Sequence, residues 1–279
     1  MIAWLQMHGI RIAIIVLLGF IAYLIARRVI PRVIKRTILL SMKGRPDADI
    51  EKRSKTISYV ITNTIGAVIG VIILFTILGQ VGVNIGPALA SLGIVGLAIS
   101  FGAQSLIKDL INGLFILMEN QYGIGDVVRV GGITGLVEEV NLRRTVLRDL
   151  DGVVHYVPNS EISTASNFTK EYSRVNLNVS VAYGEDLDRV IDVINRVCSQ
   201  MSEEPVWKQK IIKPPQVLRV DNLGDSGIEI KVLGDTRPIM QWEVMGELRR
   251  RIKKEFDREG IEIPWPHMKV FFGNQIHED

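Results

Sequence analysis

The stretch GLAISFGAQSL, residues 96–106, lies inside a long apolar segment and alternates small side chains with large ones. A helix that merely faced lipid would contain fewer glycines, because glycine is a poor helix former. Helices inside a membrane associate by close packing, and small residues four positions apart let their backbones approach. Five small residues form the predicted packing surfaces of this helix: Gly93, Gly96, Ala98, Ser100 and Gly102.

Two large residues, Leu97 and Phe101, lie between the small ones. At about 100° per residue, the Gly96/Ser100 pair and the Ala98/Gly102 pair fall on opposite flanks of a ridge formed by Leu97 and Phe101. Such a helix suits identical neighbours on both sides, and a ring of copies would point the ridge at a central pore. The alternative is that the small residues pack against other helices of the same chain. The sequence leaves both open.

The distribution of charged residues along the 279-residue chain predicts membrane-spanning helices. No Lys, Arg, Asp or Glu occurs between Thr56 and Ile107, a run of 52 residues. One crossing needs roughly 20 apolar residues, so this run predicts two spans, at about 57–79 and 87–105. A third span is expected at about 5–27. Its dense positive charge follows the apolar core, so we predict a retained anchor instead of a cleaved signal peptide.

The orientation in the membrane is predicted by basic residues. Residues 27–55 carry ten Lys or Arg against three acidic residues, and such loops stay in the cytoplasm. We therefore place the N-terminus outside and residues after about 120 inside. Arg27, Arg28 and Arg32 are expected to anchor at lipid headgroups. Residues 1–120 carry a net charge of +7 and residues 121–279 a net charge of −4, so no nucleic-acid surface is expected.

The segment LIKDLINGLFILMEN, residues 106–120, has an apolar stripe with Lys108, Asp109 and Asn112 opposite. This pattern predicts an amphipathic helix at an interface or against the next domain. Ser105 and Gly113 are candidate hinge points, because kinks occur at Gly and Ser positions. We count residues 1–120 as the transmembrane domain.

A small β-domain is predicted over residues 121–172. Four short strands, at 127–130, 136–138, 145–147 and 153–157, alternate apolar and polar residues between glycine turns. These glycines separate strands and open no helix, which argues against a phosphate-binding loop.

The pattern after residue 173 predicts a ferredoxin-like α+β domain over 173–262. A strand at 174–184, a helix at 186–201, a hairpin at 216–236, a basic-faced helix at 239–258 and a final strand at 260–272 follow this layout. Residues 263–279 form the C-terminal strand and tail. Asn222 and Asp225 fit turn chemistry better than a binding site.

Catalytic and metal-binding patterns are missing from the sequence. The four histidines are isolated, and Cys198, the single cysteine, lies on the apolar side of a predicted helix, where it is expected to be buried and inert. We expect no enzyme activity, cofactor or metal. Two rival functions stay open: a membrane-anchored binding module without a pore, and an enzyme on a membrane anchor.

The chain resembles the bacterial small-conductance mechanosensitive channel (MscS) family. The similar stretches are GLAISFGAQSLIKDLINGL, GIGDVVRVGGITGLVEEV, VPNSEI and REGIEIPWPHMKV, and together they span about residues 85–272. The resemblance implies a homoheptamer in the bacterial inner membrane, with Leu97 and Phe101 as the apolar rings of the pore. It also implies a hollow cytoplasmic vestibule and a C-terminal strand, about 263–272, that closes an axial β-barrel in the oligomer.

The resemblance implies a function too, with two departures. We expect a tension-gated channel that releases ions and small osmolytes during hypoosmotic shock. The family commonly has Leu at the second ring, where this chain has Phe101, and Gly at the main kink, where this chain has Ser105. A larger ring predicts a tighter or stiffer seal. A bend can still form at a serine, and the sequence leaves open how easily it forms and how it is linked to desensitisation.

Overall fold

The structure, a computed structural model, describes residues 2–41, 47–266 and 268. The chain forms two compact units, Met1–Gly102 and Ala103–Asp279, and the boundary falls inside a helix. Each unit is described separately.

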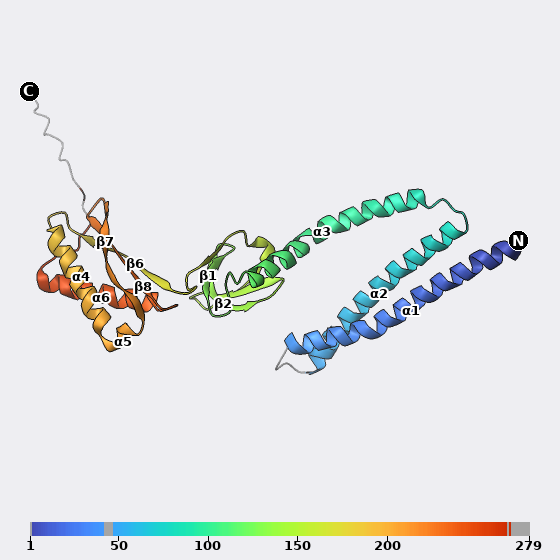
Figure 1. Cartoon of the computed structure of the whole chain (residues 1–279), viewed down its shortest axis with the longest axis horizontal. Coiled ribbons are helices and arrows are strands. Elements are labelled where there is room, and N and C mark those ends of the chain that lie inside the picture. Colours follow the sequence, from blue (N-terminus) through green and yellow to red (C-terminus); the bar gives the residue numbers. More distant parts are fainter. Residues whose placement is uncertain (1, 42–46, 267, 269–279) are drawn as a thin grey trace, which may run out of the picture. The chain divides into compact units, whose positions relative to one another are not determined.

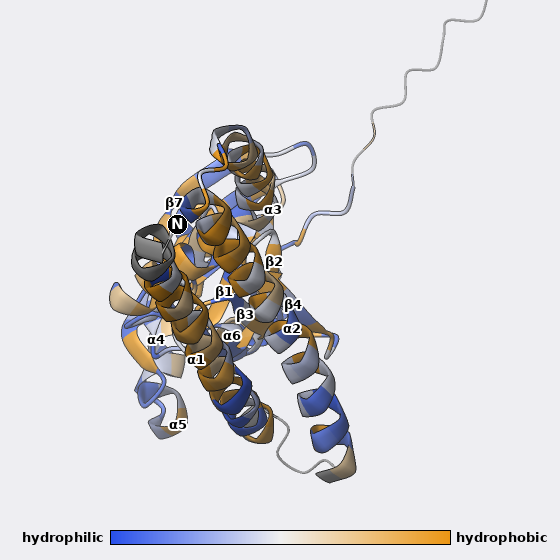
Figure 2. Ribbon diagram, turned by 90° about the vertical axis from the view of Figure 1, so that its right-hand side faces the viewer, coloured by the Kyte–Doolittle hydropathy of each residue, from blue (hydrophilic) through white to orange (hydrophobic). Residues whose placement is uncertain are grey.

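The first unit is helical. Its elements are α1 (Ile2–Ser41), α2 (Asp47–Gln80) and the first half of α3 (Gly86–Met118). All three helices are long and apolar enough to cross a membrane, as the sequence predicts. Figure 2 shows apolar residues around each of them and a hydrophilic end on both α1 and α2.

The basic stretch 27–55, expected as a loop, is helical over its described parts. The helix α1 continues to Ser41 and α2 begins at Asp47, so residues 42–46 alone lie outside the described residues. Lys and Arg are good helix formers, and charge marks the end of the apolar span without ending the helix. Even Pro31 lies within α1.

A short turn joins α2 to α3. Gly82 has a φ of +88°, which glycine adopts without strain. The Asn84 side chain accepts a hydrogen bond from the Gly86 amide (3.0 Å), which satisfies one free N–H at the start of α3.

The helices α1 and α2 run side by side and are joined by close packing (Figure 1). A side chain at Gly19 would collide with Ile73, and one at Gly66 would come within 2.9 Å of the Tyr23 ring. Along α2 the buried positions recur every four residues: Ile50, Ser54, Ser58 and Thr62. This row continues to Gly66, so α2 also uses small residues at four-residue spacing, a signal that the sequence reading missed.

The β-domain in the second unit is a five-stranded antiparallel sheet with the order β4-β3-β2-β1-β5. The strands are β1 (Val127–Val130), β2 (Ile133–Val140), β3 (Arg144–Arg148), β4 (Val154–Pro158) and β5 (Ala165–Asn167), with a 3-10 turn, η1 (Asn159–Glu161), after β4. The four predicted strands are confirmed. The fifth strand was missed because its three residues, Ala-Ser-Asn, show no apolar alternation.

The α+β domain packs its helices on one face of a three-stranded sheet, in the order β6-β8-β7. Its elements are β6 (Ser173–Val181), α4 (Leu187–Glu203), α5 (Pro205–Lys208), β7 (Ile211–Leu223), β8 (Ile228–Thr236) and α6 (Gln241–Glu259). Large buried side chains such as Ile194, Ile230 and Phe256 fill the core between sheet and helices. The predicted strand, helices and hairpin are all present.

The predicted final strand is not formed by its described residues in the single chain. Residues 261–266 and 268 are in no helix or strand, and the rest of the expected strand lies outside the described residues. A strand needs a partner for its backbone groups. Among the described residues of this segment, the Glu262 carbonyl accepts a hydrogen bond from the Ala182 amide, which directly follows β6 (3.0 Å).

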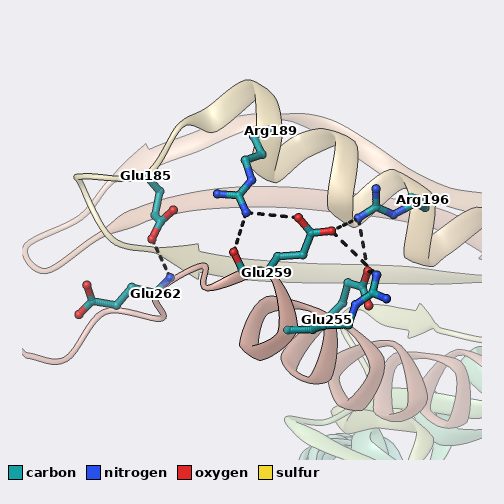
Figure 3. A network of polar contacts seen from close by, with 7 residues as sticks. Glu185, Arg189, Arg196, Glu255, Glu259 and Glu262 are labelled. Atoms are coloured by element: carbon teal, nitrogen blue, oxygen red, sulfur yellow. Dashed lines mark hydrogen bonds and ion pairs between the residues drawn. The ribbon is translucent and has the colours of Figure 1, made fainter.

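Ion pairs fix the end of α6 against α4 (Figure 3). Arg189 donates to the Glu259 carbonyl (2.6 Å), and Arg196 pairs with the Glu259 carboxylate (2.5 Å). The Glu185 carboxylate accepts from the Glu262 amide (2.7 Å). Together with the Ala182 contact, these bonds set the direction in which the chain leaves the domain.

Candidate pore helix and its joint with the β-domain

The two predicted ring residues are among the most exposed apolar side chains of α3. Leu97 is 60% exposed and Phe101 is 74% exposed in the single chain. Ile94, which is 70% exposed, lies one turn before Leu97 on the same side of the helix. The sequence reading omitted Ile94, although its three-residue spacing from Leu97 was visible.

The small-residue flanks of α3 are open as well. A side chain added at Gly93, Gly96 or Gly102 would meet nothing within 4 Å, and Ala98 and Ser100 are exposed. The glycines of the α1–α2 contact are instead covered by large side chains. The contacts of α3 with helices of its own chain therefore do not account for its small residues.

The predicted hinge positions differ in their surroundings. The helix α3 continues through Ser105 without interruption, and Ser105 is exposed. Gly113 is buried, and a Cβ there would collide with the Leu142 carbonyl and lie 2.5 Å from Asn159 Nδ2. Close packing against the β-domain is thus a second reason for glycine at this position.

The second half of α3 contacts the β-domain through its polar face. Asp109, Gly113 and Ile116 are its buried residues, and Ile116 belongs to the apolar core of the β-domain. The predicted apolar stripe is exposed in the single chain: Leu106, Ile107, Leu110, Ile111, Leu114, Phe115 and Met118. The sequence pattern predicted the polar and apolar faces of this helix correctly. The face that packs against the β-domain is the polar one.

Two hydrogen bonds connect this polar face to the turn after β4. The Asp109 carboxylate, 6% exposed, accepts from the Ser160 amide (2.7 Å). The Asn112 side chain donates to the Asn159 carbonyl (2.9 Å). We call Asp109, Asn112, Gly113, Asn159 and Ser160 the α3–β joint.

Asn159 is the centre of this joint and is fully buried. Its side chain donates to the Asn141 carbonyl (2.8 Å) and accepts from the Thr145 hydroxyl (3.1 Å). Thr145 also lies 2.9 Å from the Tyr122 hydroxyl, whose pKa is raised by burial. Buried polar groups must be paired, which explains why the VPNSEI stretch carries an Asn at this point.

The three predicted headgroup anchors, Arg27, Arg28 and Arg32, all have exposed side chains on α1. None has an ion-pair partner within the described part of the chain. Their charges are therefore available to another partner.

Other titratable groups fit structural roles. Cys198 is buried, and burial raises the pKa of its thiol to about 12, so it is a poor nucleophile at neutral pH. His155 lies 2.8 Å from Asp149, and this hydrogen bond lowers the pKa of the carboxylate. The described residues contain no group of three His, Cys, Asp or Glu side chains placed to hold a metal ion.

Three family models match this arrangement, and all describe parts of mechanosensitive ion channels. The model for transmembrane helices 2/3 matches residues 64–104, the β-domain model matches 105–170, and the MscS C-terminal model matches 175–263. A small-conductance mechanosensitive channel from Caldanaerobacter subterraneus subsp. tengcongensis is 33% identical over 225 residues, which are 81% of this chain and 79% of that protein. The chain belongs to the MscS family of mechanosensitive channels.

Other MscS-family relatives agree with this assignment. The moderate conductance mechanosensitive channel YbiO of Escherichia coli is 32% identical over 91% of this chain, which corresponds to 34% of YbiO. The small-conductance mechanosensitive channel MscMJ of Methanocaldococcus jannaschii is 29% identical over 81% of this chain and 63% of that protein. These relatives are named as channels and none of the three as an enzyme.

A solved MscS structure has the same fold. The crystal structure of Helicobacter pylori MscS in the closed state matches with a TM-score of 0.66 at 22% identity, over 96% of this chain and 99% of that chain. The predicted fold class, three membrane helices followed by a β-domain and an α+β domain, is confirmed.

Proposed function

We propose that this chain assembles into a homoheptameric channel of the bacterial inner membrane that opens under membrane tension. The observation that carries the proposal is the exposed surface of α3, where Leu97 and Phe101 lie between two bare flanks of small residues. Identical helices packed flank to flank would cover the small residues and turn the ridge toward a shared axis.

The gate in this proposal is a hydrophobic constriction. Rings of Leu97 and Phe101, one residue of each from every subunit, form two stacked apolar collars. A narrow apolar throat loses its water, and ions do not cross the dry gap. Ile94 adds an apolar turn on the same side.

Tension opens the channel by favouring the state with the larger area in the membrane plane. The packed pair α1–α2 faces lipid and transmits the tension, with Arg27, Arg28 and Arg32 held at anionic headgroups by about 1 kcal/mol each. Sliding of the small flanks past one another withdraws the ridge and wets the throat. The N-terminus is outside, and the β-domain and α+β domain are cytoplasmic.

The α3–β joint gives this movement a fixed lower end. Gly113 and Ile116 are buried against the β-domain, and Asp109 bonds the turn after β4. The part of α3 before Ser105 makes no comparable contact within the described chain. Ser105 therefore lies between a free segment and a held one, which is where a hinge would act.

Stretch-activated single-channel recording tests the proposal. The purified chain in liposomes should give discrete openings under suction and none without it, with permeation of ions and small osmolytes. A membrane-anchored binding module would give no conductance at any tension short of rupture. Native mass measurement in detergent tests the heptamer, and a monomer there would overturn the shared pore.

A further inference from the structure

The apolar stretch of α1 is short and has an arginine at each end. Arg11 and Arg27 lie 16 positions apart, with no charged residue between them. At the rise of an α-helix, their Cα atoms are about 24 Å apart along the axis. The hydrocarbon core of a typical bilayer is about 30 Å thick, so this stretch does not span it. Tilting the helix would shorten its reach further.

The contacts between α1 and α2 show which residues of the two helices lie at the same level. A Cβ at Gly19 would collide with Ile73, and one at Gly66 would meet the Tyr23 ring. The two helices are therefore antiparallel, and residues can be counted in both directions from these contacts. Arg11 is then level with about residues 78–81 of α2, and Arg27 with about residues 62–65.

Polar residues of α2 lie at the level of Arg27. Thr62 and Asn63 occur there, and Asn63 lines the same groove between α1 and α2 as Tyr23. The next residue of α1, Arg28, is also basic and exposed. Charged and amide side chains are costly in hydrocarbon. The apolar band of the pair therefore ends at this level, about five residues inside the predicted start of the second span at 57.

An exposed aromatic side chain supports this inner limit. Tyr59, four residues before Asn63 on α2, is 69% exposed. Tyrosine is typical of the membrane–water interface, where its ring meets lipid and its hydroxyl meets water. Tyr59 thus fits the headgroup region and not the hydrocarbon core.

The outer limit is set by Arg11. Its side chain is exposed and has no ion-pair partner within the described part of the chain. Its level is that of the end of α2 at Gln80 and of the turn that contains Gly82. Both helices therefore leave the apolar band at the same height.

We propose that the α1–α2 pair is matched to a thin bilayer with a hydrocarbon core of about 24 Å, bounded by Arg11 on one side and by Arg27, Arg28 and Asn63 on the other. The partner is the lipid itself, selected by acyl-chain length. The inference requires that α1 and α2 cross the membrane and does not depend on whether the chain conducts.

The test measures the relative affinity of the purified full chain for phosphatidylcholines of different chain length. Leu18 is 60% exposed and lies near the middle of the band, so Leu18→Trp, combined with Trp4→Phe, places a reporter there. The other three tryptophans lie outside the candidate spans. Brominated phosphatidylcholines with chains of about 14 to 22 carbons quench a tryptophan that they contact. We expect the strongest binding at about 14 to 16 carbons and at least about threefold weaker binding at 22.

A matched pair of variants tests the outer boundary. Arg11→Leu leaves no Lys, Arg, Asp or Glu before Arg27, so the preferred chain length should rise by about two to four carbons. Arg36→Leu is the control, because Arg36 is also exposed on α1 but lies nine residues beyond Arg27, outside the band. Its preference should equal that of the parent.

Three results would overturn the proposal. Equal affinity for all chain lengths would show that the long arginine side chains reach the headgroups of thick bilayers as well. An optimum at about 20 carbons or more would show a band of ordinary or greater thickness. Equal shifts in the Arg11 and Arg36 variants would show that Arg11 does not set the boundary.

Discussion

Phe101 is the side chain on which the proposed gate depends most. The sequence places it where the MscS family commonly has Leu, and it is 74% exposed in the single chain. In the proposed channel, a ring of phenylalanines should exclude water from a wider opening than a ring of leucines would, so we expect a more stable closed state and a higher opening tension.

Replacing Phe101 with Ser should lower the opening tension and slow growth, because a hydroxyl keeps the throat wet. Patch recordings of Phe101→Ser and the parent channel measure the shift. Ile99→Ser, on the opposite face of α3, should leave the tension closer to that of the parent. An unchanged threshold in Phe101→Ser would count heavily against the pore assignment.

Close packing in the α3–β joint leaves no room for a side chain at Gly113. An added methyl group would collide with the Leu142 carbonyl, so Gly113→Ala should destabilise the second unit by about 1–3 kcal/mol. Chemical unfolding of the full chain followed by tryptophan fluorescence measures this loss.

Gly246→Ala is the matched control for Gly113, because it also lies within a helix but has open space around it. It should stabilise the protein by about 0.5–1 kcal/mol, since alanine is the better helix former. Loss of stability in both variants would refute the packing role of Gly113.

At the scale of the helix, substitutions of the small residues on the flanks of α3 distinguish a pore-forming helix from a simple membrane anchor. Leucine at Gly96 or Ala98 should prevent close approach of neighbouring helices, and so raise the opening tension or block assembly. Native mass measurement and patch recording report the two effects. Ile99→Phe adds similar bulk on the face away from the ridge and should be tolerated. A simple membrane tether would tolerate all three changes equally.

A further prediction for α3 concerns the effect of Lys108 on ion selectivity. It lies seven residues after Phe101, close to two full turns, and is exposed without a partner in the described chain. A ring of these lysines below the gate would favour anions, so Lys108→Glu should move the reversal potential in a KCl gradient toward that of K⁺. Lys253→Glu, on α6, is the charge-matched control. Equal shifts in both variants would exclude a ring at the pore mouth.

At the scale of the whole molecule, ion pairs make the stability of the second unit depend on pH. Arg250 and Arg251 hydrogen-bond the Glu247 carboxylate and lower its pKa to about 2. Because the folded pKa is depressed, this stabilisation is present above the ordinary glutamate pKa of 4.5 and is lost as pH falls toward 2. Neighbouring pairs at Glu204 and Glu259 act in the same direction.

The thermal unfolding midpoint of the full chain should therefore fall between about pH 4.5 and pH 2. Glu247→Gln should lower the midpoint at pH 7 and converge on the parent at the acidic end of this window. A constant difference between the two proteins across that range would show that the Glu247 ion pairs are not its source.

The sequence by itself determined the membrane spans, four strands of the β-domain and the helices and hairpin of the α+β domain. These features depend on local patterns: 52 residues without charge, apolar alternation between glycines, and a helical stripe that buries Cys198. It also placed the ridge of Leu97 and Phe101 between small flanks, since helical spacing fixes which residues share a face.

Tertiary structure alone decided what each face meets. The pairing of Asp109 with Ser160 joins residues 51 positions apart, and no local pattern selects between a polar face in water and one bonded to a buried turn. The same holds for the buried Asn159 and for residues 261–266, which form no strand. Buried polar groups are hydrogen-bonded, here by partners that are distant in the sequence. The sequence shows that such a group needs a partner, but it does not show which residue provides it.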